Sequence, residues 1–241
     1  MSTLPRTLQT IQWLLLTSWG LLLIVAFWRG KLNAERTRRS NLWLQRRTAL
    51  LLAVMAIIFW MGGRNSFLTG FVGFVAIGMS ISFVADLIMA EIIRVPNRVL
   101  AGILVFGSAH LIYLVGIVSA DSAFGHSTDV LLGPTALGFT LFGIVIWLLF
   151  VRAPQESTLL NYGALGYAIL ICVLAGTALI LARSEDQFWM LSAGVLLFVL
   201  SDIILGNQIF RRNNWYLVSE VVWFTYISGQ ALIVWTSATV L

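Results

Sequence analysis

The chain has 241 residues, of which 59% are hydrophobic and only 10% are charged. Soluble domains carry roughly 25% charged residues, so the composition excludes a soluble globular fold and indicates a polytopic membrane protein. The net charge of +5 does not indicate nucleic-acid binding, because the basic residues are concentrated in loops, seven of them in one, instead of covering a surface. The single cysteine, Cys172, excludes an intramolecular disulfide and a cysteine-based metal site.

Eight hydrophobic stretches are long enough, or nearly so, to cross about 30 Å of hydrocarbon. They lie near residues 11–28, 48–63, 68–91, 98–118, 132–152, 160–183, 187–206 and 216–240. The first stretch ends in a basic cluster, which predicts an uncleaved helix and not a signal peptide. The sequence therefore predicts an all-α protein in which residues 1–241 form a single domain of eight transmembrane helices. It predicts no particular oligomeric state.

Basic residues are concentrated in every second loop of this arrangement. Twelve of the 15 lie in the loops after the first, third, fifth and seventh stretches. They are Arg29, Lys31, Arg36, Arg38, Arg39, Arg46, Arg47, Arg94, Arg98, Arg152, Arg211 and Arg212. The positive-inside rule predicts that these loops are cytoplasmic and that both termini lie outside, in an inner or plasma membrane.

The two halves of the chain share a pattern. A shift of 116 residues places Asp86 on Asp202 and His110 on Tyr226. The surrounding segments, SFVADLIMA and FVLSDIILG, each carry an aspartate followed by an apolar triplet and a small residue. Four helices are an even number, so this pattern predicts a parallel 4+4 repeat about an axis along the membrane normal.

Asp86 and Asp202 interrupt otherwise apolar helices. A carboxylate in hydrocarbon costs about 2.5–3.5 kcal/mol on insertion scales. That cost favours a functional role, because asparagine or serine would join helices more cheaply. We expect each aspartate about four or five residues before the cytoplasmic end of its helix, about 6–8 Å inside it. We expect Glu91 and Glu220 at the membrane interface, within reach of headgroup water.

Polar side chains on the fourth and eighth stretches provide partners for the aspartates. His110 and Tyr113 are three residues apart, and Tyr226 and Gln230 are four apart, so each pair shares a helix face. Polar groups in hydrocarbon require partners, so we expect these side chains to gather around the two aspartates. The alternative, that they only hydrogen-bond helices together, stays open.

Several classes of chemistry are excluded. The only lysine, Lys31, lies in a loop, which excludes a retinal Schiff base. Two histidines and one cysteine leave no zinc-binding spacing, and the chain has neither a Walker loop nor a GxSxG elbow. Carboxylate chemistry in a lipid-accessible cavity, or the movement of protons or ions, remains.

Two segments resemble the signatures of the YhhN-type lysoplasmalogenases. Residues 78–114 carry FVAD followed 24 residues later by HLIY, and residues 193–233 carry FVLSDIILG followed by TYISGQALI. The resemblance implies that the two motif aspartates are catalytic, here Asp86 and Asp202. It places at the other motif positions, as substrate-binding residues, His110, Tyr113, Tyr226 and Gln230. The chain departs from the pattern at Ala85, where glycine is usual, and lacks a Lys-Pro pair in QRRTALLLAV.

The resemblance implies hydrolysis of the vinyl ether bond of lysoplasmalogens to a fatty aldehyde and glycerophosphoethanolamine or glycerophosphocholine. It implies a lysophospholipid substrate, contact with membrane lipids, and no metal or cofactor. Two carboxyl groups suit this reaction, because one can donate a proton while the other stabilises the cation and activates water.

Two other functions remain open from the residues alone. One is a proton-coupled transporter of a small molecule or lipid, because paired membrane acids and four-helix repeats also occur in carriers. The other is a non-catalytic lipid-binding or scaffold protein.

Overall fold

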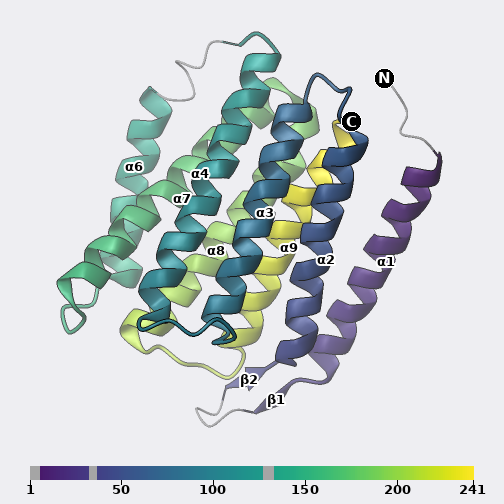
Figure 1. Ribbon diagram of the computed structural model, residues 1–241. Helices are drawn as coiled ribbons and strands as arrows, with labels where there is room; N and C mark the ends of the chain where they lie inside the picture. The colour runs from purple at the N-terminus through teal and green to yellow at the C-terminus, as the bar shows by residue number, and fades with distance from the viewer. Residues whose placement is uncertain (1–5, 33–36, 127–132) are drawn as a thin grey trace.

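The computed structural model describes residues 6–32, 37–126 and 133–241, with side chains from residue 10 onward (Figure 1). Within these ranges it has eight helical segments long and apolar enough to cross a membrane, which confirms the all-α transmembrane fold. They are α1 (Arg6–Trp28), α2 (Leu42–Gly62), α3 (Thr69–Met89), α4 (Arg98–Ala123), α6 (Pro134–Ile146) with the π-helical turn η1 (Trp147–Val151), α7 (Thr158–Ser184), α8 (Trp189–Arg211) and α9 (Val218–Thr239). The short elements are the antiparallel strands β1 (Lys31–Leu32) and β2 (Arg38–Arg39), and a 3-10 turn, η2 (Asp186–Phe188).

Several helices begin where the local sequence provides a cap. The side chains of Asn41, Asn97 and Ser157 accept hydrogen bonds from first-turn backbone N–H groups of α2, α4 and α7. Pro134 is the first residue of α6, a position where its missing N–H group costs nothing. Inside hydrocarbon each helix satisfies its backbone internally, so these caps decide where the helix ends lie.

Six of the helices form a closed ring. Neighbours pack in the order α2, α3, α4, α7, α8 and α9, and α9 returns to α2. Outside the ring α1 packs on α2 and α6 packs on α7, at opposite edges of the bundle (Figure 1). Helices α1, α2, α3 and α4 pack on one another in the same order as α6, α7, α8 and α9. A 4+4 repeat requires this correspondence.

Helices α8 and α9 approach closely at two glycines. A Cβ atom on Gly194 would lie 2.7 Å from the carbonyl oxygen of Gly229, and one on Gly229 would lie 2.6 Å from that of Gly194. Small residues let helix backbones approach, and the resulting van der Waals contact drives helix association in lipid. This contact sets the distance between the helix that carries Asp202 and the helix that carries Tyr226.

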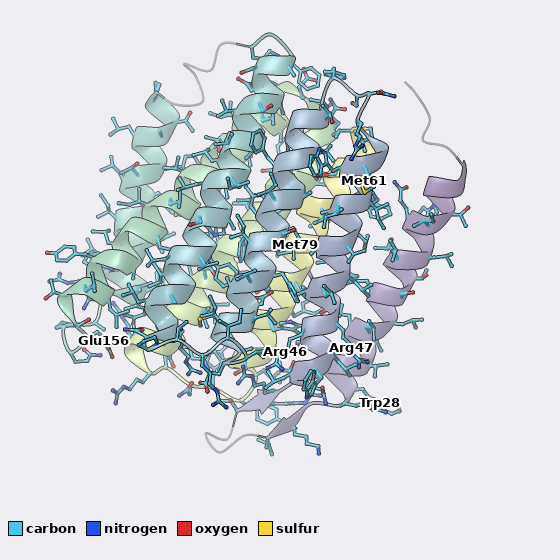
Figure 2. The ribbon with its side chains drawn as sticks, in the orientation of Figure 1. Trp28, Arg46, Arg47, Met61, Met79 and Glu156 are labelled. Atoms are coloured by element: carbon cyan, nitrogen blue, oxygen red, sulfur yellow. The ribbon has the colours of Figure 1, made fainter. Side chains whose placement is uncertain are left out.

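Helix α2 begins earlier than the sequence analysis predicts. It starts at Leu42 and not near residue 48, because Asn41 caps it. Arg46 and Arg47 therefore lie in the helix, and the prediction that they belong to the preceding loop is wrong. Figure 2 shows both arginines at the end of α2 next to the β-hairpin, with Met61 at the opposite end.

Helix α8 also runs farther than predicted, to Arg211 and not to residue 206. Phe210 is buried against the η1 turn, so packing extends the helix past the predicted end. Asp202 consequently lies nine residues before the end of α8, whereas Asp86 lies three residues before the end of α3. The predicted equal distance from the two helix ends is wrong.

Glu220 is buried and does not lie at the water interface expected from the sequence. Its side chain is 3% exposed, its Oε1 lies 3.1 Å from Nη1 of Arg38, and its Oε2 accepts a hydrogen bond from the hydroxyl of Ser40. Because Arg38 belongs to β2, this buried ion pair holds the β-hairpin against the start of α9. Glu91 is exposed and pairs with Arg98.

Basic residues gather at the end of the bundle that carries the β-hairpin. Arg39, Arg46, Arg98 and Arg212 come from four separate segments and line one cavity there. Arg36 lies outside the described residues. The start of α1 and the end of α9 lie at the opposite end (Figure 1). Which compartment each end faces stays a prediction.

Candidate active site

A cavity of about 770 Å³ lies inside the ring, at the β-hairpin end, and is called the polar cavity below. Its walls come from α2, α3, α4, α8 and α9, with contributions from β2 and the loop after α8. Asp86 of α3, Asp202 of α8 and Tyr226 of α9 line it. The lining also includes the four arginines Arg39, Arg46, Arg98 and Arg212. One space therefore joins two carboxyl groups to a cationic region.

Asp86 is positioned by a contact between α3 and α9. The Tyr226 hydroxyl donates a hydrogen bond to Oδ2 of Asp86 at 2.8 Å. The Tyr226 ring is held in turn by Phe106, edge to face at 5.8 Å between centroids, and by Phe198 at 5.0 Å. The orientation of the Asp86 carboxyl group is thus set by aromatic packing on the neighbouring helices.

Asp202 is positioned by α7 and α4. The Tyr167 hydroxyl donates a hydrogen bond to Oδ2 of Asp202 at 2.6 Å, and Nε2 of His110 lies 3.0 Å from the same hydroxyl. His110 is fully buried, with Nε2 4.0 Å from Oδ2 of Asp202. A phenol hydroxyl both donates and accepts hydrogen bonds. The three linked groups can therefore hold a proton on the His110 imidazole, or on the Asp202 carboxyl group when the direction of both hydrogen bonds is reversed. Asp202 therefore ends a hydrogen-bonded chain along which a proton can move.

Tyr113 and Gln230 form a third polar pair, behind the cavity wall. The Tyr113 hydroxyl donates to Oε1 of Gln230 at 2.8 Å, and both side chains are buried. Neither these two residues nor His110 lines the polar cavity, whereas Tyr226 does. The four residues predicted to bind substrate thus divide into one in the cavity wall and three that support the wall from behind.

The two aspartates have related partners from opposite halves of the chain. The shift of 116 residues that relates Asp86 to Asp202 also relates Tyr226 to His110. Tyr226 faces Asp86 from α9, and His110 faces Asp202 from α4. Tyr167 lies between His110 and Asp202 and has no counterpart, because the same shift places it on a leucine. The two halves of the site are therefore chemically distinct.

Tyr167 is the residue that the sequence analysis missed. It comes from α7, a helix without an internal acidic residue, and its partner Asp202 is 35 residues away. A signal was present, because a hydroxyl well inside an apolar stretch needs a hydrogen-bonding partner in hydrocarbon. Tyr167 shares this property with His110 and Gln230, which also carry polar groups inside apolar stretches.

The ring of helices and its carboxylate-lined cavity define a polytopic membrane protein with a polar site near one end of the bundle. The chain belongs to the YhhN family, whose model matches residues 47–237, from the first turns of α2 to the last turn of α9. The matched region contains both aspartates, Tyr167 and the core of the ring, but not α1 or the β-hairpin. Comparison with curated proteins and with solved structures finds no match.

Proposed function

We propose that the protein hydrolyses the vinyl ether bond of lysoplasmalogens, releasing a fatty aldehyde and glycerophosphoethanolamine or glycerophosphocholine. The observation that carries the proposal is that both Asp86 and Asp202 line the same cavity as four arginines. A lysoplasmalogen has matching parts, an anionic phosphate and, beyond the glycerol, an acid-labile vinyl ether. Membership of the YhhN family and the resemblance of both aspartate motifs to lysoplasmalogenase signatures support the same function.

The arginines are suited to bind the phosphate. Arg46 donates to the carbonyl oxygen of Ala90 at 3.3 Å, and Arg98 pairs with Glu91, so both guanidinium groups are held at the cavity wall. A guanidinium stays charged and can form two parallel hydrogen bonds with phosphate oxygens. A headgroup bound there directs the ether toward the two aspartates.

Hydrolysis of a vinyl ether begins with protonation of carbon. One carboxyl group donates its proton to the β-carbon of the double bond, which leaves an oxocarbenium ion at the carbon bonded to oxygen. The other carboxylate stabilises this cation and takes a proton from the water that attacks it. In the hemiacetal a proton moves from the new hydroxyl to the glycerol oxygen, the C–O bond breaks, and aldehyde and alcohol leave. One water is consumed.

The two carboxyl groups act as a pair in this mechanism. One of them must carry a proton while the other is ionised, and the two exchange these roles in each turnover. The chain from Asp202 through Tyr167 to His110 offers a second position for that proton. It can return the proton to the cavity between turnovers.

A proton-coupled carrier is the competing function. A carrier must open its site to each side of the membrane in turn. The lining of the polar cavity comes from one end of the ring, and buried Phe59, Phe71 and Met79 fill the core toward the other end. Figure 2 shows Met79 midway along α3. This packing favours an enzyme entered from one end.

The direct test is a lipid panel on purified protein, read by mass spectrometry. Aldehyde should form from lysoplasmenylethanolamine but not from its saturated ether or ester analogues. In D₂O the aldehyde should carry one deuterium on C2, because protonation occurs at that carbon. If no vinyl ether yields aldehyde and the protein moves lipid across the membrane of proteoliposomes, the protein is a carrier and not a hydrolase.

Tyr167→Phe should lower kcat at least about tenfold, because a hydrogen bond to a charged group contributes about 1.5–3 kcal/mol and orients Asp202. Loss of the hydroxyl also removes a partner from Asp202 and His110 and lowers the thermal unfolding midpoint, so kcat is measured at a temperature where the variant is folded. Tyr162→Phe is the matched control, since Tyr162 lies on the same helix with its side chain 65% exposed. Equal rates for the two variants would show that the Tyr167 hydroxyl has no part in the reaction.

A further inference from the structure

A second cavity, of about 90 Å³, lies between α4, α7, α8 and the η1 turn and is called the chain pocket below. Its lining is apolar except for Tyr167 and Asp202. The mechanism above assigns nothing to this space. An apolar cavity that ends on a carboxyl group of the site is the strongest unassigned feature among the described residues.

The chain pocket and the polar cavity share part of their lining. The shared residues are Met89, Phe106, Asp202, Leu205 and Ile209. Of these only Asp202 has a polar side chain. The polar cavity, with its arginines, lies on one side of Asp202, and hydrocarbon side chains lie on the other. This change of polarity matches a lipid with a charged head, a reactive ether and then a hydrocarbon chain.

We infer that the chain pocket binds the first carbons of the hydrocarbon chain of a single-chain phospholipid, with the vinyl ether beside Asp202. The identity of the reacting bond rests on the proposed function. A pocket of about 90 Å³ has room for a few carbons of one chain, and the choice of a single-chain lipid likewise rests on the proposed function. Chain carbons gain little on leaving the bilayer for another apolar space, so the pocket acts by orienting the double bond.

Small residues on α7 create the space. Ala164, Ala168 and Cys172 are four residues apart, so they lie on one face of the helix, and all three line the chain pocket but not the polar cavity. Larger side chains at these positions would fill the pocket without touching the arginines or Asp86. Ala164 and Ala168 thus determine which hydrocarbon chains fit the pocket.

Cys172 provides a probe that needs no substitution, because it is the only cysteine of the chain and lines the pocket. Its modification by methyl methanethiosulfonate can be followed on the intact protein by mass spectrometry. A saturated-ether lysophospholipid, which is not hydrolysed, should slow the modification about tenfold at ten times its Kd. Glycerophosphoethanolamine, which has no chain, should not slow it.

Ala168→Leu tests the same pocket by filling it. The value of kcat/KM for a long alkenyl chain should fall about tenfold relative to wild type, and by less for an unsubstituted vinyl ether, which has no carbon beyond the double bond to enter the pocket. Ala193→Leu is the control, because Ala193 is exposed on α8 and lines neither cavity, and it should leave both rates unchanged.

These results separate the pocket from the reaction. Lipid protection of Cys172 without any aldehyde release would support the pocket and reject the hydrolase. Aldehyde release with unprotected Cys172, or with Ala168→Leu slowing the unsubstituted vinyl ether as much as the long-chain one, would overturn the pocket and leave the hydrolase standing.

Discussion

Asp86→Asn and Asp202→Asn should each lower the rate of vinyl ether hydrolysis by at least about 100-fold, the lower limit typical of positioned acid–base catalysis. An amide neither donates a proton to carbon nor carries the charge that stabilises the oxocarbenium ion. It still accepts a hydrogen bond, so Tyr226 and Tyr167 keep their partners and the fold should persist. The measurement is aldehyde release under single turnover.

Binding and chemistry can be separated in these variants. A saturated-ether lysophospholipid should bind both about as well as wild type, because the arginines are untouched. Asp186→Asn is the matched control, an exposed carboxylate on the η2 turn that lines neither cavity, and it should keep full activity. Full activity in either Asp86→Asn or Asp202→Asn would remove that aspartate from the mechanism.

Gly194→Ala should destabilise the protein by about 1–3 kcal/mol, the usual cost of overpacking a closely packed contact. The new Cβ would meet the Gly229 carbonyl oxygen at 2.7 Å, and backbone on both helices must shift to accommodate it. The shift separates Asp202 on α8 from Tyr226 on α9, so activity should fall as well. Thermal unfolding in detergent and aldehyde release measure the two effects.

Gly166→Ala is the same chemical change, but it should not destabilise the protein. Gly166 lies on α7 with no atom within 4 Å of its added Cβ. Alanine is favoured over glycine in a helix by about 1 kcal/mol, so this variant should be neutral or slightly more stable. If Gly194→Ala and Gly166→Ala shifted the unfolding midpoint equally, the close contact between α8 and α9 would not contribute to stability.

The sequence alone was sufficient for the class of fold. Hydrocarbon requires every spanning segment to satisfy its own backbone, so apolar stretches of sufficient length predict helices without knowledge of their neighbours. The insertion cost of a carboxylate is equally local, which is why Asp86 and Asp202 could be singled out from their own segments. Helix ends were less predictable, because α8 extends to Arg211 through burial of Phe210 against η1, a contact with another helix.

The makeup of the site depended on tertiary structure. Tyr226 meets Asp86 across 140 residues and Tyr167 meets Asp202 across 35, and no local pattern encodes either pairing. The burial of Glu220 likewise depends on Arg38 and the β-hairpin, 182 residues away. Composition and insertion cost are properties of single segments, and the sequence by itself determined a transmembrane helical protein with two costly aspartates. Which side chains face a common cavity depends on how separate helices pack, and only the folded structure decided that.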